Sequence, residues 1–197
     1  MNSFELNLYL NDLKNIYPFF NIDNIGQSVL GKDIPVVKIG TGPNKVFYSG
    51  AFHANEFITS VLLTRFISSY CFCYKNNLNI AGYSARMLFN NSTIYIVPMI
   101  NPDGVDLVTG YINPASSIFL KAQNIANNFP DIPFPNGWKA NINGVDLKNF
   151  QPLCKAFYCL IYTALLVFFF PFIIFSILIN SSKFSVIEFN FEKLKYI

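Results

Sequence analysis

Histidine is nearly absent from this sequence of 197 residues, since His53 is the only one. The four cysteines, at positions 71, 73, 154 and 159, form no C-x-x-C pair. The first 20 residues carry early acidic side chains and lack a basic start followed by an apolar core, so they do not resemble a signal peptide. The cysteines therefore predict buried or free thiols in a reducing compartment, and the chain is expected to be cytoplasmic or membrane-associated.

Charged residues are also sparse. They make up 13% of the chain, and 14 basic against 11 acidic side chains leave a formal net charge of +3. This charge is too small and too scattered to indicate a nucleic-acid partner. Apolar residues make up 52%, which permits a sizeable core in one domain.

The apolar pattern predicts alternating helices and strands. Residues 4–16 have helical spacing and end before Pro18, and residues 57–70 are apolar on most sides, as in a buried helix. Further elements are expected as strands at 35–39, 45–49, 93–99 and 144–147 and as helices at 85–89 and 117–127. This alternation predicts an α/β domain over residues 1–150, with a largely parallel sheet and flanking helices.

The segment 45–69 contains the most informative motif. Its strand breaks at Ser49-Gly50, and His53 and Glu56 follow before the apolar helix begins. A spacing of three residues at a helix start places the imidazole and the carboxylate on one face. Nitrogen and carboxylate oxygen are ligands that suit zinc. A capping or surface pair produces the same His-x-x-Glu pattern, so this motif alone leaves both interpretations open.

Polar residues follow or end two further predicted strands. Asn101 opens the run N-P-D-G, a strong turn signal, and Asp146 lies in the run G-V-D-L. Ligands of α/β sheets lie beyond the carboxyl ends of the strands. We therefore expect His53, Asn101 and Asp146 to converge at one edge of the sheet.

Three motifs in this order, HANE at 53–56, NPDG at 101–104 and GVDL at 144–147, resemble the zinc metallocarboxypeptidases of the carboxypeptidase A type. The lead-in GQSVLGKDIPVVKIG at 26–40 and the run WKAN at 138–141 also resemble the bacterial branch of γ-D-glutamyl-L-diamino acid endopeptidases, which cut cell-wall peptides. The similarity extends over about residues 3–150. It implies a truncated carboxypeptidase-like mixed or parallel sheet with flanking helices, and a zinc-dependent peptidase activity.

The resemblance also implies roles for individual residues. His53 and Glu56 match two of the three zinc ligands, and Asp146 matches the carboxylate that holds the first histidine in one tautomer. Lys139 stands where the family usually has an arginine that polarises the scissile carbonyl, and a lysine supplies the charge without the bidentate fork. Asn149 resembles, displaced by one position, a residue that holds the substrate carboxylate.

The match ends abruptly after G-V-D-L. The family continues with an asparagine and usually an arginine, whereas this chain has Lys148-Asn149-Phe150. No histidine follows His53, and no later glutamate matches the family's general base. We therefore expect weak or absent zinc binding, an incomplete catalytic set and little or no turnover. Two alternatives stay open: a membrane-anchored, non-catalytic relative that binds peptides, and an acyl-amino-acid deacylase, against which the N-P-D-G run and the lead-in count.

The remaining residues, 151–197, are expected to form an unrelated apolar tail. Residues 156–179 contain no charge over 24 positions, a length that predicts a transmembrane helix. A frameshift in an AT-rich gene is the competing hypothesis, because Phe, Ile, Leu, Lys and Asn dominate the tail. The break falls inside a motif rather than in a linker, which favours a frameshift or truncation. Reading the other two frames beyond codon 148 would decide between them.

Overall fold

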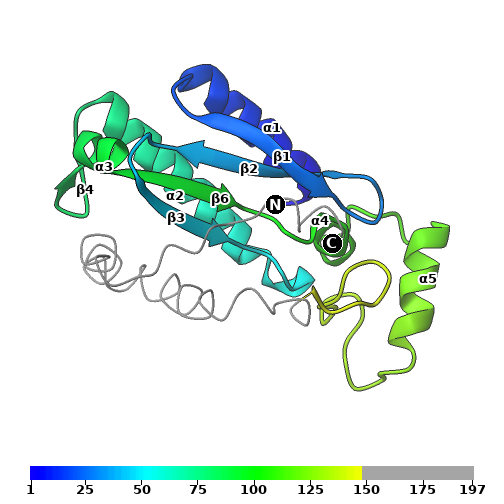
Figure 1. Cartoon of the computed structure of the whole chain (residues 1–197). Coiled ribbons are helices and arrows are strands. Elements are labelled where there is room, and N and C mark those ends of the chain that lie inside the picture. Colours follow the sequence, from blue (N-terminus) through cyan, green and yellow to red (C-terminus); the bar gives the residue numbers. More distant parts are fainter. Residues whose placement is uncertain (148–197) are drawn as a thin grey trace.

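A four-stranded mixed sheet forms the centre of the molecule, and the computed structural model describes residues 1–147 of it (Figure 1). The strand order is β1-β2-β6-β3. The strands are β1 (Asn21–Gln27), β2 (Asp33–Ile39), β3 (Asn44–Ser49) and β6 (Ser92–Val97). The predicted α/β class is confirmed.

The expected predominance of parallel pairs is wrong for the described strands. β1 pairs with β2 and β2 pairs with β6 in antiparallel fashion, and only β3 and β6 run parallel. The link between β1 and β2 is too short for a crossover, so this pair has to be antiparallel. β3 and β6 are joined through a long helical connection, which permits the parallel arrangement.

The side chains of the strands alternate between two faces of the sheet, as strand geometry requires. Val37 and Ile39 of β2 lie on the same face as Ile94 and Ile96 of β6, in the larger apolar cluster. The opposite face carries Ile34, Val36 and Val97, which pack with Ile100 and Leu147. β6 is therefore buried on both faces, as its run of apolar residues predicts.

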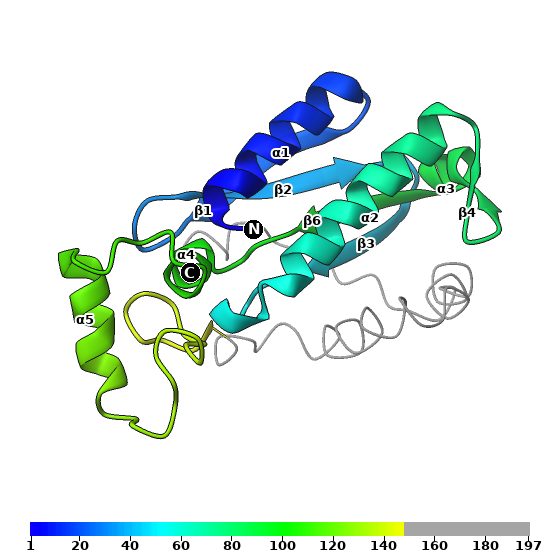
Figure 2. The same cartoon turned by 180° about the vertical axis from the view of Figure 1, so that it is seen from behind.

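Two long helices cover the face of the larger cluster (Figure 2). The first, α1 (Ser3–Ile16), begins with a capping box in which the Asn2 side chain accepts from the Glu5 amide at 2.8 Å and Glu5 accepts from the Asn2 amide at 2.9 Å. Its Leu6, Leu10 and Leu13 face the sheet. The helix predicted at 4–16 is thus confirmed.

The second helix, α2 (Ile58–Lys75), is amphipathic rather than buried on all sides. Leu63, Ile67 and Tyr70 pack into the larger cluster, whereas Ile58 and Phe72 are 64% and 51% exposed. By length and composition residues 54–75 could cross a membrane, but the core helix of a soluble protein passes the same test. Its packing against the sheet identifies it as a core helix.

The remaining elements complete the described residues. They are the 3-10 turn η1 (Ala54–Glu56), β4 (Asn79–Ile80), β5 (Tyr83–Ser84), α3 (Ala85–Asn91), α4 (Pro102–Val108) and α5 (Ser117–Ala126). The helices predicted at 85–89 and 117–127 are confirmed as α3 and α5. Asn149, the domain boundary at 150, the apolar segment 156–179 and the cysteines at 154 and 159 lie outside the described residues.

Two sequence-based expectations are corrected. The N-P-D-G run does not form an isolated turn but begins α4, because the Asn101 side chain accepts from the Gly104 amide at 3.1 Å and Pro102 occupies the first helical position. Residues 144–147 do not form a strand. Instead, the side-chain oxygen of Asn141 accepts from the amides of Asn143 and Val145, both at 3.0 Å, and folds these residues into a compact loop.

The two acidic side chains of α4 anchor the helix inside the molecule. Asp103 and Asp106 are buried, and the Lys32 ammonium lies 3.2 Å and 2.6 Å from them. The amide and hydroxyl of Ser3 donate to Asp106 at 2.7 Å and 2.5 Å, and the Ser28 hydroxyl donates to Asp103 at 3.0 Å. Since buried carboxylates are tolerated only when paired and hydrogen-bonded, this cluster fixes α4 against α1 and the β1–β2 turn.

Both cysteines in the described residues are free thiols, as expected. Cys71 is buried in the larger cluster, and this burial raises the pKa of its thiol to about 12. Cys73 is partly exposed, and burial raises the pKa of its thiol as well. A raised pKa leaves little thiolate at neutral pH, so neither thiol has the character of a nucleophile.

A candidate metal centre beyond β3 and β6

The chain turns sharply between the end of β3 and η1, and His53 lies in this turn. Ala51 adopts a positive φ of 50°, and its amide donates to the Thr59 hydroxyl at 2.7 Å. Its carbonyl accepts from the Asn101 amide at 3.1 Å. A left-handed conformation is strained for alanine and persists only when surrounding contacts hold it. These two hydrogen bonds therefore fix the turn that presents His53.

The imidazole of His53 lies between two carboxylates. Nδ1 is 2.9 Å from Oε1 of Glu56, and Nε2 is 3.4 Å from Oδ1 of Asp146. The His53 side chain is 12% exposed, whereas those of Glu56 and Asp146 are 49% and 41% exposed. A neutral imidazole carries one N–H and one lone pair, and because a carboxylate only accepts, the 2.9 Å contact requires the N–H on Nδ1, which donates to Glu56. Nε2 then carries the lone pair and makes no hydrogen bond among the described residues, although Asp146 lies 3.4 Å away.

Asn101 connects the two loops that supply these groups. Its side-chain nitrogen donates to the carbonyl of Phe52 at 3.2 Å and to that of Ala140 at 3.0 Å. The amide of Ala54 strengthens the same connection by donating to the carbonyl of Lys139 at 3.0 Å. The expected convergence of His53, Asn101 and Asp146 is therefore observed, although Asp146 arrives on a loop and Asn101 contacts backbone carbonyls.

Gly104 allows these loops to approach α4. A Cβ atom at this position would lie 2.6 Å from the Asn101 side-chain nitrogen, 2.7 Å from the Ala140 carbonyl oxygen and 2.8 Å from the Ala54 Cβ. Contacts this short are excluded, so only glycine fits. The N-P-D-G run thus supports the candidate centre structurally. The prediction of a simple turn did not include this role.

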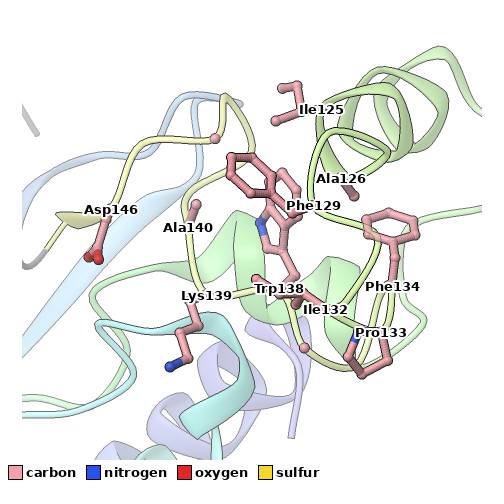
Figure 3. A pocket seen from close by; sticks show the side chains of 12 residues that line it. Ile125, Ala126, Phe129, Ile132, Pro133, Phe134, Trp138, Lys139, Ala140 and Asp146 are labelled. Atoms are coloured by element: carbon pink, nitrogen blue, oxygen red, sulfur yellow. The ribbon is translucent and has the colours of Figure 1, made fainter.

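Lys139 is exposed beside this loop, and its ammonium forms no ion pair with the described residues. Lys139 and Asp146 both line an apolar pocket (Figure 3). This pocket is not predictable from local sequence patterns, because most of its apolar residues lie in irregular chain without periodic spacing.

The donor atoms of His53 and Glu56 have the chemistry of a zinc site, with one imidazole nitrogen and one carboxylate oxygen. Two donors that share a tetrahedral zinc ion lie about 3.4 Å apart. The observed 2.9 Å is within a small side-chain rotation of that separation. Within residues 1–147, no histidine, cysteine or carboxylate adds a third metal ligand to His53 and Glu56. The residues therefore fit part of a zinc site.

The zinc carboxypeptidase family model matches residues 6–152, and the chain belongs to this family. A γ-D-glutamyl-L-diamino acid endopeptidase 1 from Lysinibacillus sphaericus is 40% identical over 153 residues, which are 76% of this chain and 38% of that protein. A carboxypeptidase E from Caenorhabditis elegans is 33% identical over 142 residues, covering 68% of this chain and 26% of that protein.

Solved structures agree with this assignment at the level of the fold. Thrombin-activatable fibrinolysis inhibitor has a TM-score of 0.52 at 19% identity, covering 71% of this chain and 29% of that chain. The bovine form, in complex with a tick carboxypeptidase inhibitor, has a TM-score of 0.51. The chain therefore spans less than two fifths of the length of these relatives.

Proposed function

We propose that His53 and Glu56 are two of the protein ligands of a zinc-dependent peptidase site, and that Asp146 orients His53. The observation that carries this proposal is the position of one imidazole between two carboxylates, with Nδ1 facing Glu56 and Nε2 facing Asp146. A metal-bound histidine commonly donates its second N–H to a carboxylate, which fixes its tautomer. A surface ion pair would explain the contact with Glu56 but not the second contact, with Asp146.

A zinc ion at such a site polarises a carbonyl and lowers the pKa of bound water. The residues of this chain would supply its binding and its surroundings. In the zinc-bound state the imidazole proton would move from Nδ1 to Nε2, where Asp146 would accept it. His53 would then offer the Nδ1 lone pair, and Glu56 a carboxylate oxygen, to the metal. Lys139 would place a positive charge near the substrate oxygen, without the paired contacts of an arginine.

The proposed substrates are peptides of the cell-wall type. The family acts on peptides, and a relative that is 40% identical is named for cleavage between γ-D-glutamyl and L-diamino acid residues. The lead-in at 26–40 and the run WKAN support this branch of the family.

We further propose that these 197 residues bind zinc weakly and turn over little or no substrate by themselves. The chain contains no histidine besides His53, so its described part offers only two ligands. A complete structural zinc site is worth about 10–16 kcal/mol, so each ligand contributes on the order of 3–4 kcal/mol. A site with two ligands should therefore bind at least about a hundredfold more weakly than one with three.

Metal analysis of the purified full chain tests this proposal. After dialysis against a mild chelator we expect well under one zinc ion per chain. In a direct zinc titration, His53→Ala and Glu56→Gln should each abolish the remaining binding, and Asp146→Asn should weaken it by about tenfold or more. Asp12→Asn, an exposed acid on α1, is the matched control and should leave zinc binding unchanged. Stoichiometric zinc that survives dialysis would show that a third ligand exists.

The membrane-anchored, peptide-binding alternative depends on residues 156–179, which lie outside the described residues, and it stays a prediction.

A further inference from the structure

The loop that leads to Asp146 contains an asparagine followed by glycine, Asn143-Gly144. Both residues are exposed, and Gly144 adopts a positive φ of 81°, a conformation that favours glycine. Asparagine is prone to deamidation in this pair, because no Cβ atom shields the glycine amide nitrogen from the asparagine side chain. Since the pair directly precedes Val145 and Asp146, a chemical change in it bears on the candidate metal centre.

A lysine of α5 contacts the side chain of Asn143. The last described loop and α5 lie at the same end of the molecule (Figure 1), and the Lys121 ammonium donates to Oδ1 of Asn143 at 2.9 Å. Such a charge-assisted hydrogen bond draws electron density from the side-chain carbonyl. It therefore makes Cγ more electrophilic, and it stabilises the negative charge that the oxygen gains when a nucleophile adds to this carbon.

A second pair, Asn136-Gly137, provides a comparison within the same chain. Asn136 is also exposed, and the Gly137 amide donates to the Pro133 carbonyl at 2.6 Å. The Gly144 amide donates to the Asn141 carbonyl at 3.0 Å, so local opening of a turn is needed at both sites before the amide can react. Among residues 1–147, however, no side chain donates to Asn136. The two pairs therefore differ in the cation that contacts the asparagine.

We propose that Asn143 is a site of spontaneous deamidation, with water as the co-reactant, and that Lys121 selects it over Asn136. The Gly144 backbone nitrogen loses its proton to the solvent and forms a bond to Cγ of Asn143. The bond from Cγ to the side-chain nitrogen breaks, and this nitrogen takes up a proton and leaves as ammonia. Water then opens the resulting cyclic imide. Attack on the side-chain carbonyl yields aspartate, and attack on the main-chain carbonyl yields isoaspartate.

Isoaspartate at position 143 alters the loop, because the main chain then passes through the side-chain carbon and gains one methylene group. The loop depends on Asn141, whose amide donates to the Val145 carbonyl at 2.8 Å. The side-chain oxygen of Asn141 accepts from the amides of Asn143 and Val145, both at 3.0 Å. These bonds lie on both sides of the modified residue, so a longer main chain does not keep all of them. The modification therefore moves Asp146 relative to His53, which lies 3.4 Å away.

Peptide mass spectrometry of the aged full chain tests the proposal. Trypsin cleaves after lysine, so Asn136 and Asn143 fall in separate peptides, 122–139 and 140–148. During incubation at mildly alkaline pH, we expect Asn143 to deamidate several-fold faster than Asn136, with isoaspartate among the products. In concentrated urea, which unfolds the chain and removes the contact with Lys121, the two rates should become similar.

Substitutions of Lys121 test its role through the ratio of the two rates. Lys121→Met should lower the rate at Asn143 relative to Asn136 several-fold, whereas Lys121→Arg keeps a charged donor and should retain the fast rate. Lys45→Met changes an exposed lysine on β3 and is the matched control, with an unchanged ratio. Equal rates at the two asparagines in the folded chain, or an unchanged ratio in Lys121→Met, would overturn the proposal.

The imidazole signals of His53 in NMR test the effect on the candidate centre, with a chelator present. A second set of these signals should grow at the rate at which isoaspartate accumulates. Asn143→Gln forms a cyclic imide far more slowly and should show no second set. Asn143→Asp changes the charge but not the main chain, and its His53 signals should stay close to the original ones. Isoaspartate without a second set of signals overturns the assigned movement of Asp146. Because these experiments need no metal, their failure is distinct from a failure of the zinc titration.

Discussion

The side-chain nitrogen of Asn101 lies 3.0 Å from the carbonyl oxygen of Ala140, although the two residues are 39 positions apart. The same nitrogen reaches the carbonyl of Phe52 at 3.2 Å, and the side-chain oxygen caps α4. One amide thus joins the turn that carries His53, the loop that leads to Asp146 and the start of a helix. The geometry of the candidate centre therefore depends on a residue that does not itself contact His53, Glu56 or Asp146 through a hydrogen bond.

Replacing Asn101 by alanine should disturb both stability and the centre. Loss of the cap and of the buried donor should lower the free energy of unfolding by about 1–3 kcal/mol, measured by urea denaturation. Because His53 is the only histidine, its imidazole nitrogen signals in NMR report on the contact with Asp146 without ambiguity. Asn113→Ala, which removes an exposed turn hydrogen bond to Ala115, is the control. Unchanged His53 signals in Asn101→Ala would contradict the assigned role.

Gly104→Ala should separate the loops from α4. The added methyl would overlap the Asn101 side chain and the Ala140 carbonyl, which costs about 1–3 kcal/mol for an overpacked position. Gly82→Ala is a useful comparison, because it has a positive φ of 89° but meets no atom within 4 Å. Both variants should be less stable, yet only Gly104→Ala should shift the His53 signals. Identical spectra for the two variants would show that Gly104 supports the fold alone.

Stability should fall at alkaline pH because of the buried thiol of Cys71. Burial raises the pKa of this thiol from its ordinary value of 9.0 to about 12. The unfolded chain therefore loses its proton first as pH rises, so the stabilisation is complete below pH 9 and declines from there toward pH 12. Unfolding of Cys71→Ala should show a weaker dependence over this range.

Alkylation followed by peptide mass spectrometry tests the burial of the Cys71 thiol. At pH 8, Cys73 should be modified before Cys71, because Cys73 is partly exposed and Cys71 is buried. Faster modification of Cys71 would show that α2 opens readily from the sheet.

The exposed apolar side chains of α2 predict low solubility for residues 1–150 when they are produced alone. Ile58, Val61 and Phe72 are 64%, 36% and 51% exposed, and each large apolar side chain forgoes about 1.5–3 kcal/mol of burial. Residues 1–150 produced alone should be insoluble or bind hydrophobic dyes, and the double change Ile58→Lys and Phe72→Ser should reduce dye binding. A soluble monomer with a sharp thermal transition and no dye binding would show that this region is a self-sufficient domain.

Periodic apolar patterns predicted most elements of the fold. The leucines of α1 and the isoleucines of β6 have local spacing that decides their structure, and the helix and strand bounds differ from the predicted ones by a few residues. The parallel character of the sheet was overestimated, because strand direction depends on which strands pair, and pairing is not encoded within any one strand.

The candidate centre was only partly predictable, because some of its contacts join residues that are distant in sequence. His53 and Glu56 are near neighbours in sequence, so their spacing indicates a shared face. Asparagine, proline and glycine favour a turn and a helix start alike, and the choice at Asn101 is decided by carbonyl groups of residues 52 and 140. The pocket near Trp138 is built from irregular chain, where no periodic pattern exists to detect.

The hydrogen bonds between Ser3 and Asp106 have a consequence for biosynthesis. The two residues are separated by 103 positions, and a ribosome that adds about 5–20 residues per second needs on the order of 5–20 s to cover that interval. During this time α1 has emerged but lacks its anchor, and its leucines have no complete sheet to cover them. The nascent N-terminal segment therefore exposes its leucines during this interval, and the region around His53 can reach its final shape only after the loop that carries Asp146 has left the ribosome.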